Sequence, residues 1–221
     1  MQMNCVIFDM DGVIVDSEII HQKCEREIFD ILGVPVSQEQ HSSMVGRTDE
    51  DMWSQISDWY ALPVSVEKAI RMKKSLYLQY LEDDGSMKTV PYVTELIEDL
   101  YRDGFLLALA SSSSRIQIDH VLDKFRLRKF FNVIVSGDDV KEGKPHPGIF
   151  LKVTAILGIN PESCIVIEDS ENGVSAAKAA NMKCIGFINP NSGRQDLSKA
   201  DIIVDSFHGL SALKVSEFAN H

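Results

Sequence analysis

Short apolar runs recur along the chain at intervals that suit buried strands. They stand at residues 5–8, 105–110, 133–135, 164–167, 184–188 and 202–204. Several of these runs contain almost no polar residue, which is typical of parallel strands covered by helices on both faces. The pattern therefore predicts a sheet of mostly buried strands.

Segments of helical character alternate with these runs. Residues 92–103 follow a proline, residues 114–125 open with polar side chains, Pro147 stands where a first helical turn can begin, and alanines dominate residues 176–180. These are signals of helix starts and of strong helix formers. Alternation of strand and helix predicts an α/β fold with a Rossmann-like parallel sheet.

The stretch between residues 17 and 88 breaks this alternation, because it contains no convincing strand. Its amphipathic segments lie at 18–32, 49–59 and 66–81, separated by glycines and prolines. We interpret residues 17–88 as a helical insert after the first strand, closed by the polar residues 83–86. Residues 1–16 and 89–221 then form the core, and the insert lies beside the carboxyl edge of the sheet, where α/β proteins bind ligands.

Charge and composition restrict the partners. The chain has 221 residues, 44% of them hydrophobic, and a formal net charge of −11. Such a balance argues against binding to nucleic acid or to anionic membranes and favours a small-molecule partner. The first residues carry no basic segment, and no apolar run approaches the ~18 residues of a membrane span, so neither a signal peptide nor a membrane helix is expected.

Cysteine usage indicates the compartment. The four cysteines form no C-x-x-C pair, and three of them stand inside apolar strand-like runs, where cysteine acts as a small hydrophobe. We expect neither zinc nor disulfides, and we expect a cytoplasmic, monomeric protein.

Two aspartates, Asp9 and Asp11, directly follow the first apolar run, and Gly12 allows a tight turn after them. An isolated D-x-D-G is most often a polar turn. A calcium loop is excluded, because it needs glycine at its sixth position and glutamate at its twelfth, whereas Gly12 stands fourth from Asp9.

A second acidic pair, Glu168 and Asp169, follows the run at 164–167. The carboxyl ends of parallel strands meet at one edge of the sheet, so both pairs should border one crevice. Four carboxylates there would repel one another unless a divalent cation lay among them. A hard, oxygen-liganded ion such as Mg²⁺ fits this set of ligands.

Hydroxyl groups and a lysine stand between the two acidic pairs. Ser111 ends the run at 105–110 and could donate to an anion in the crevice, and one of the serines at 112–114 should cap the following helix. Lys144 stands in a proline-rich loop before a helix. It is not a nucleotide-binding P-loop lysine, because the glycine spacing is wrong and Pro145 replaces the required Ser or Thr.

Four motifs occur in order along nearly the whole chain: DMDGVIVDSE, LALASSS, GKPHPGIF and IVIEDSENGVSAAKAA. Together they resemble the haloacid dehalogenase superfamily of phosphotransferases, and within it β-phosphoglucomutase and the sugar-phosphate phosphatases. The resemblance implies a Rossmann-like core whose site is closed by a small helical cap, here the helical insert.

The resemblance also implies roles for the two aspartates of the first motif. Asp9 matches the nucleophile that attacks phosphorus and becomes an aspartyl phosphate. Asp11 matches the general acid and base, and its backbone carbonyl would bind Mg²⁺. Such chemistry needs an ionised nucleophile beside the metal and a second carboxyl group that exchanges protons near neutral pH.

The other motifs supply binding groups by the same resemblance. Ser111, with Ser112 beside it, matches the phosphate-binding position, and Lys144 matches the lysine that offsets charge on nucleophile and phosphate. Asp169 matches a magnesium ligand, and Glu168 binds the ion or its water shell.

Substrate choice should lie in the helical insert, because the core motifs contact only the phosphoryl group. His21 stands where β-phosphoglucomutase-like proteins have a histidine, Arg47 could bind a distal anion, and Lys73 roughly matches a lysine that contacts sugar phosphates. The mutases have a tryptophan where this chain has Glu25, which weakens a mutase assignment.

These features predict a Mg²⁺-dependent phosphatase that acts on a small phosphorylated metabolite, such as a sugar phosphate or a related polyol or acid phosphate. The alternative is a β-phosphoglucomutase-like phosphohexomutase, which returns the phosphoryl group from Asp9 to a second hydroxyl. A non-catalytic phosphoacceptor of the receiver type is disfavoured by the order of the motifs and by the helical insert.

Overall fold

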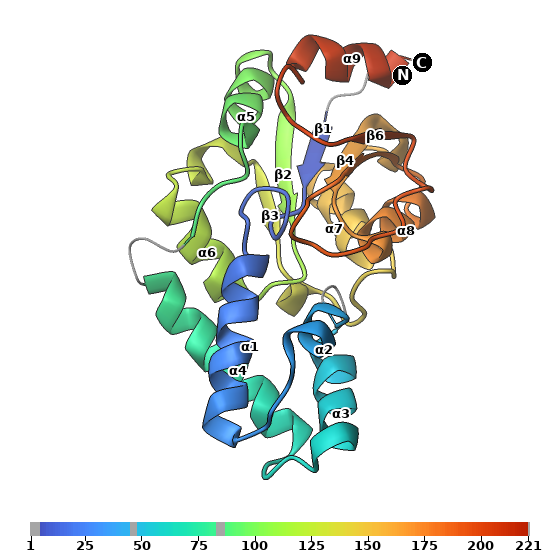
Figure 1. Ribbon diagram of the computed structural model, residues 1–221. Helices are drawn as coiled ribbons and strands as arrows, with labels where there is room; N and C mark the ends of the chain where they lie inside the picture. Colours follow the sequence, from blue (N-terminus) through green and yellow to red (C-terminus); the bar gives the residue numbers. More distant parts are fainter. Residues whose placement is uncertain (1–4, 45–47, 83–86, 221) are drawn as a thin grey trace.

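The computed structural model describes residues 5–44, 48–82 and 87–220, and its centre is a six-stranded parallel sheet (Figure 1). The strand order is β3-β2-β1-β4-β5-β6, and every neighbouring pair is parallel. The strands are β1 (Cys5–Phe8), β2 (Leu106–Ala110), β3 (Val133–Val135), β4 (Cys164–Glu168), β5 (Lys183–Phe187) and β6 (Ile202–Val204). All six coincide with predicted apolar runs to within one residue, so the predicted α/β class is confirmed.

Helices cover both faces of this sheet, as the almost wholly apolar strands require. Helices α5, α6 and α9 pack against the face that carries Val6 and Phe8, and helices α7 and α8 pack against the face that carries Cys5 and Ile7. Their bounds are α5 (Val93–Arg102), α6 (Arg115–Lys124), α7 (Gly148–Leu157), α8 (Glu171–Ala179) and α9 (Ala212–Asn220), with short 3₁₀ turns η1 (Arg128–Phe130), η2 (Gly137–Asp139) and η3 (Pro161–Ser163).

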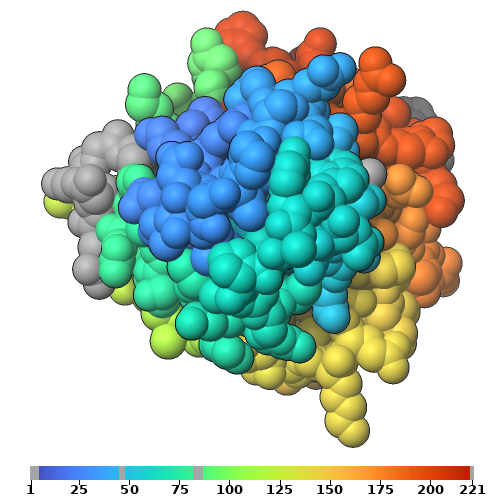
Figure 2. Space-filling view, turned by 60° about the horizontal axis from the view of Figure 1, so that its bottom comes forward, coloured from blue at the N-terminus to red at the C-terminus, as the bar shows by residue number. Residues whose placement is uncertain are grey.

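The helical insert contains four helices and, within the described residues, no strand. They are α1 (Glu18–Leu32), α2 (Gln38–Ser42), α3 (Asp49–Tyr60) and α4 (Val66–Glu82). Helix α4 packs on α1 and α3, and the insert has its own apolar core around Phe29, Trp53 and Ile56. Figure 1 shows the insert below the sheet, and Figure 2 shows its blue to cyan residues covering the middle of that end of the molecule.

Paired connections hold the insert at the carboxyl edge of the sheet. The backbone leaving β1 and the backbone returning toward α5 run side by side: Asp16 N donates to Lys88 O at 3.0 Å and Val90 N donates to Ile14 O at 2.9 Å. Val15 and Thr89 form an antiparallel bridge between them. The insert is therefore joined to the core by two adjacent backbone segments, the first of which directly follows Asp9 and Asp11.

Two helices were not predicted. Helix α2 has only five residues, and its start depends on a reciprocal cap in which Ser37 and Gln40 bond each other's backbone N–H groups. Helix α9 docks on α5 at the end of the chain. The polar segment 83–86, expected to close the insert, lies outside the described residues. No helix in the described part of the chain is long and apolar enough to cross a bilayer.

Candidate active site

Asp9 stands directly after β1 and is 6% exposed. Its backbone N–H donates to Ile167 O at 3.0 Å, which extends the pairing with β4 by one residue. The chain then turns sharply at Gly12, where φ is +78°. A Cβ at Gly12 would lie 1.9 Å from Asp169 Oδ2, so only glycine allows the turn to approach this carboxylate.

The second acidic pair ends the neighbouring strand. Glu168 is the last residue of β4, and Asp169 follows it. Because Phe8 is in register with Ile167, the residues that follow them, Asp9 and Glu168, are brought next to each other. Asp9, Glu168 and Asp169 are all buried, and each offers a carboxylate oxygen within 4.8 Å of the others. The sheet thus brings together three of the four carboxylates that were predicted to converge, and Asp11 is not part of this group.

Lys144 reaches into this cluster from the loop before α7. Its Nζ lies 2.6 Å from Asp9 Oδ1 and 2.6 Å from Glu168 Oε1, and it donates to Ala110 O at 3.1 Å. The other oxygen of Glu168 accepts hydrogen bonds from the backbone N–H and hydroxyl of Ser170. Both oxygens of Glu168 are therefore occupied, and its clearest contact is with Lys144.

The electrostatics of the cluster show that one lysine does not neutralise it. Burial raises the pKa of Asp9 to about 7 although Lys144 opposes this, and Glu168 and Asp11 raise it further. Burial, with repulsion by Glu168 and Asp9, also raises the pKa of Asp169 well above its usual value. Burial alone would lower the pKa of Lys144, but Asp9 and Glu168 outweigh it and the pKa is raised. The cluster lacks positive charge.

The donor set fits a magnesium ion. Asp9 and Asp169 supply hard carboxylate oxygens, and the absence of a Cβ at Gly12 lets Asp169 Oδ2 lie directly against the turn after Asp9. Ser192 donates to that oxygen at 2.5 Å, and Asn189 from the same loop donates to Gly12 O at 2.8 Å. A divalent cation here would supply the charge that the cluster lacks.

Asp11, two residues after Asp9, has different partners. Its Oδ1 accepts from Ser17 Oγ at 2.7 Å, and its Oδ2 accepts from Ser113 Oγ at 2.6 Å and from Ser111 Oγ at 3.3 Å. Ser17 and Ser113 were not predicted as partners of Asp11. Their signals were slight: Ser17 precedes a predicted helix, and Ser113 stands within a run of four serines.

The serines that follow β2 differ in their burial and in their contacts. Ser111 is fully buried beside Asp11, and its Oγ also accepts from the backbone N–H of Ser113 at 3.0 Å. Ser112 is exposed and lines a neighbouring cavity of about 400 Å³ with Lys74 and Tyr77. Ser114 is the N-cap of α6, which confirms that one of the three serines after Ser111 caps this helix.

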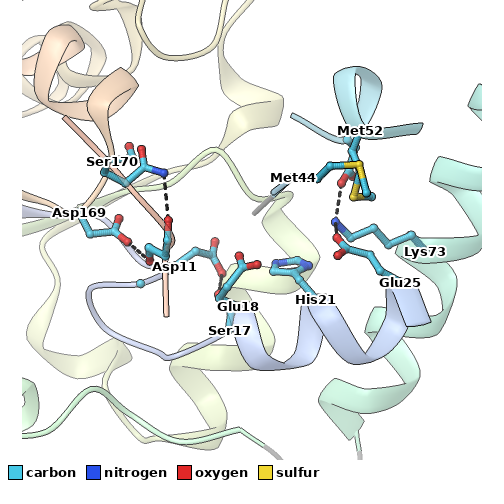
Figure 3. Close-up of a pocket in the computed structure, with 14 residues that line it drawn as sticks. Asp11, Ser17, Glu18, His21, Glu25, Met44, Met52, Lys73, Asp169 and Ser170 are labelled. Carbon is cyan, nitrogen blue, oxygen red and sulfur yellow. Dashed lines mark hydrogen bonds and ion pairs between the residues drawn. The ribbon is translucent and has the colours of Figure 1, made fainter. Parts of the chain in front are cut away.

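A pocket of about 280 Å³ lies between the sheet edge and the helical insert. Figure 3 shows Asp11 and Asp169 at one end and His21, Glu25 and Lys73 at the other. The complete lining consists of Asp11, Gly12, Ser17, Glu18, His21, Glu25, Met44, Asp49, Met52, Lys73, Asp169, Ser170, Ser192 and Gln195. The predicted substrate residues His21 and Lys73 therefore face the same pocket as the acids of the core.

His21 projects from α1 into this pocket. Its ring stacks on Tyr77 with centroids 4.3 Å apart, and its buried Nδ1 has no hydrogen-bond partner within the described residues. Burial and the charge of Lys73 lower the pKa of His21, against the opposing effect of Asp11. A neutral imidazole with a free nitrogen can bond a hydroxyl group of a ligand.

Lys73 is held by two carboxylates of the insert. Its Nζ lies 2.6 Å from Glu25 Oε1 and 2.5 Å from Asp49 Oδ1, and His41 Nε2 lies 2.6 Å from the other oxygen of Glu25. Burial would raise the pKa of Glu25, but His41 and Lys73 outweigh it and the pKa is lowered. Glu25 is thus a paired, buried anion.

The structure brings together most of the predicted site residues. Asp9, Asp11, Ser111, Lys144, Glu168 and Asp169 lie at the carboxyl edge of the sheet, and His21 and Lys73 lie across the pocket. Arg47 lies outside the described residues and stays a prediction. The chemical role of each residue is likewise still a prediction.

Comparison with protein families identifies the class. A family model described as haloacid dehalogenase-like hydrolase matches residues 6–187, which is most of the chain and includes both acidic pairs, Ser111 and Lys144. The chain belongs to the haloacid dehalogenase-like hydrolases. It is therefore an enzyme, and its six-stranded parallel sheet is the core of that fold.

Relatives within this hydrolase family have carbohydrate-related names. The chain is 34% identical over 191 residues to a phosphorylated carbohydrates phosphatase from Thermotoga maritima, covering 83% of this chain and 84% of the relative. It is 33% identical over 190 residues to hexitol phosphatase B from Escherichia coli K12, covering 83% of each. The crystal structure of a β-phosphoglucomutase from Clostridium difficile is 28% identical and superposes with a TM-score of 0.79, covering 99% of this chain and 97% of that one.

Proposed function

We propose that this hydrolase is a Mg²⁺-dependent phosphatase of small phosphorylated carbohydrates that works through an aspartyl phosphate on Asp9. One observation carries the proposal: Lys144 holds Asp9 in a buried cluster of three carboxylates, while Asp11, two residues later, is bonded by serine hydroxyls. The names of the phosphatase relatives support the carbohydrate class.

Asp9 is the nucleophile in this proposal. Lys144 binds its Oδ1, which orients the carboxylate and leaves Oδ2 to attack phosphorus. A bound Mg²⁺, held by Asp9, Asp169 and the Asp11 carbonyl, would neutralise charge on the phosphoryl oxygens. Lys144 offsets the charge of both Asp9 and the phosphoryl group, and Glu168 holds Lys144 in place. Alignment and charge neutralisation supply most of the lowering of the barrier in such transfers.

Asp11 is the general acid and base. As an acid it protonates the oxygen of the leaving carbohydrate, and as a base it then removes a proton from the water that attacks the phosphorylated Asp9. Ser17 and Ser113 bond the two oxygens of its carboxyl group and so fix its orientation. Ser111, fully buried next to Asp11, can turn its hydroxyl from Asp11 to a phosphoryl oxygen.

Residues 17–88 act as a cap that covers the bound carbohydrate, while residues 1–16 and 89–221 form the catalytic core. The pocket between them supports this division, because its wall on the insert side comes from α1, α3 and α4 and its wall on the core side comes from the sheet edge. His21 contacts the carbohydrate from the cap side, and excluding water there strengthens the electrostatic interactions at the phosphate.

A phosphohexomutase is the second candidate, favoured by the similarity to the β-phosphoglucomutase structure. Both activities begin with transfer to Asp9 and differ in whether water or a sugar hydroxyl accepts the phosphoryl group. Incubation with β-glucose 1-phosphate, a trace of glucose 1,6-bisphosphate and Mg²⁺ separates them. Release of inorganic phosphate supports the phosphatase, and formation of glucose 6-phosphate with little free phosphate supports the mutase.

The nucleophile is tested with Asp9→Asn. We expect hydrolysis of p-nitrophenyl phosphate in Mg²⁺ to fall by at least about a thousandfold, because the uncharged amide of asparagine is too weak a nucleophile to form the acyl phosphate. The fold should persist, since the change removes one of several buried like charges. Circular dichroism and urea unfolding check this.

Asp103→Asn, a change of an exposed aspartate at the end of α5, is the matched control and should keep its activity.

Excess EDTA should abolish turnover by the unmodified enzyme, and added Mg²⁺ should restore it. Turnover by a folded Asp9→Asn protein at the level of the control would remove Asp9 from its proposed role.

A further inference from the structure

The insert side of the 280 Å³ pocket is an acidic wall. Among the described residues that line it on this side, three are carboxylates, Glu18, Glu25 and Asp49, and one is a cation, Lys73. We call these three carboxylates with Lys73 the insert wall. It faces the part of a bound substrate that lies away from the phosphoryl group.

Lys73 does not offer this wall a free positive charge. It is 7% exposed, and its ammonium bonds both Glu25 and Asp49 at 2.6 and 2.5 Å. An ammonium has three donors, so one donor is left for a ligand after these two contacts. One remaining N–H suits a hydroxyl group, whereas a phosphate requires several donors and compensating charge.

Glu18 is the acid of the insert wall that contacts no cation among the described residues. Its Oε1 accepts only a long hydrogen bond of 3.3 Å from Gln22 among the described residues. Burial raises its pKa to about 7, and repulsion by Glu25 adds to the effect. A wall that disfavours one more negative charge on its own carboxyl group disfavours a negative charge on a ligand for the same reason.

The other groups on this side suit a neutral, hydroxylated chain. His21 presents a buried ring nitrogen that has no partner in the described part of the chain, and Met44 and Met52 supply apolar surface for a carbon skeleton. Carboxylates of the wall can accept hydrogen bonds from hydroxyl groups. Donors, acceptors and apolar surface are all present, and the element missing from the described wall is an uncommitted cation.

We infer that the insert wall selects phosphate monoesters whose remote end is an uncharged polyol or sugar and rejects bisphosphates by charge repulsion, so a distal anion bound by Arg47 would not be a second phosphate of the substrate. This inference rests on the proposed phosphatase function and narrows its substrate class. It assigns Glu25 and Asp49 as specificity-determining residues, and it disfavours a mutase cycle, which must bind a bisphosphate intermediate.

The test is a competition assay against p-nitrophenyl phosphate at fixed excess free Mg²⁺. Hexitol 6-phosphates and hexose 6-phosphates are compared with the bisphosphates of the same carbon skeletons, such as fructose 6-phosphate with fructose 1,6-bisphosphate. We expect the best monophosphate to compete at least about tenfold better than its bisphosphate, as expected for unscreened like charges in a pocket. A bisphosphate that competes equally well or better overturns the inference.

Variants then assign the effect to the wall. Glu25→Gln and Asp49→Asn should each reduce this preference by about tenfold. Glu50→Gln, the exposed neighbour on α3, removes the same charge from outside the pocket and should leave the preference unchanged. Glu18→Gln, which breaks no ion pair in the described residues, should also reduce the preference and covers the case in which Glu25→Gln fails to fold. An unchanged preference in folded Glu18→Gln and Asp49→Asn proteins would overturn the assignment.

Failure of this inference is distinguishable from failure of the proposed function. p-Nitrophenyl phosphate carries no remote charge, so its Mg²⁺-dependent hydrolysis reports the core alone. If the aryl phosphate is hydrolysed but bisphosphates compete best, only the inference about the wall is wrong. If no phosphate ester is hydrolysed, the phosphatase proposal itself is wrong.

Discussion

Buried carboxylates gather in two regions of this hydrolase, and the two clusters are neutralised differently. At the sheet edge, Asp9 and Glu168 share Lys144, while Asp169 accepts a hydrogen bond from the hydroxyl of Ser192. In the helical insert, Glu25 is bonded by Lys73 and by His41. Carboxylates that are similarly buried are therefore neutralised to different extents, because the two regions differ in the number of cations that contact them.

The pKa directions show the consequence. At the sheet edge, burial outweighs Lys144 and raises the pKa of Asp9 and of Asp169. In the insert, His41 and Lys73 outweigh burial and lower the pKa of Glu25. A cluster with raised carboxyl pKa values is prepared to accept a cation, whereas a cluster with a lowered pKa is already complete. The comparison distinguishes a cation-binding site from a cluster whose carboxylates already have cations.

Removing Lys73, the cation shared by Glu25 and Asp49, should have the largest effect on stability. Lys73→Met leaves Glu25 and Asp49 without their shared cation, and we expect a loss of roughly 3 kcal/mol in the free energy of unfolding. Urea unfolding measures it. Lys74→Met removes the exposed neighbouring lysine on α4 and should change stability by less than about 0.5 kcal/mol. Equal, small losses in both variants would show that the network contributes little.

Binding of Mg²⁺ to the acidic cluster at the sheet edge should have the next largest effect on stability. Mg²⁺ at about 100 times its dissociation constant should raise the free energy of unfolding by about 2.7 kcal/mol, because it binds the folded state only. Asp169→Asn should lose most of this increase, measured by urea unfolding with and without the ion. Glu171→Gln, an exposed acid in the first turn of α8, is the control. An equal increase in Asp169→Asn and in the control would place the ion elsewhere.

Acidification should have the smallest effect on stability of the three changes. The pKa of Glu25 in the folded protein lies below its ordinary value of 4.5. Its ionised form therefore stabilises the fold above pH 4.5, and this contribution is lost as the pH falls through the folded pKa. The stability difference between the unmodified protein and Glu25→Gln should shrink from pH 6 to pH 4. A difference that stays constant or grows on acidification would contradict the lowered pKa.

Much of the core was predictable because its signals are local. Each strand is a short apolar run, and in a parallel sheet the residues after such runs meet at one edge. Asp9 and the pair Glu168 and Asp169 therefore come together once β1 and β4 are neighbours. The helices α1, α3 and α4 were also predicted from their amphipathic pattern, to within one residue at each end.

The partners of individual oxygens were not predictable in this way. Ser113 and Asp11 are 102 positions apart in the sequence, and nothing local shows that their side chains meet. The network of Glu25, Lys73, Asp49 and His41 joins all four helices of the insert, so it depends on how those helices pack. From the sequence, Glu25 was interpreted only as a departure from the mutase pattern, and its place in a charged wall was not predicted.

The sequence by itself determined the parallel sheet, the helical insert and the acids at the strand ends, because strand periodicity and strand-end chemistry are properties of a few consecutive residues. Only the tertiary structure decided which anions obtain a cation. Lys144 reaches Asp9 across 135 positions and Lys73 reaches Asp49 across 24, and such pairings depend on the packing of whole elements. Charge balance in a buried site is a long-range property of the fold, since each missing or added cation comes from a distant segment.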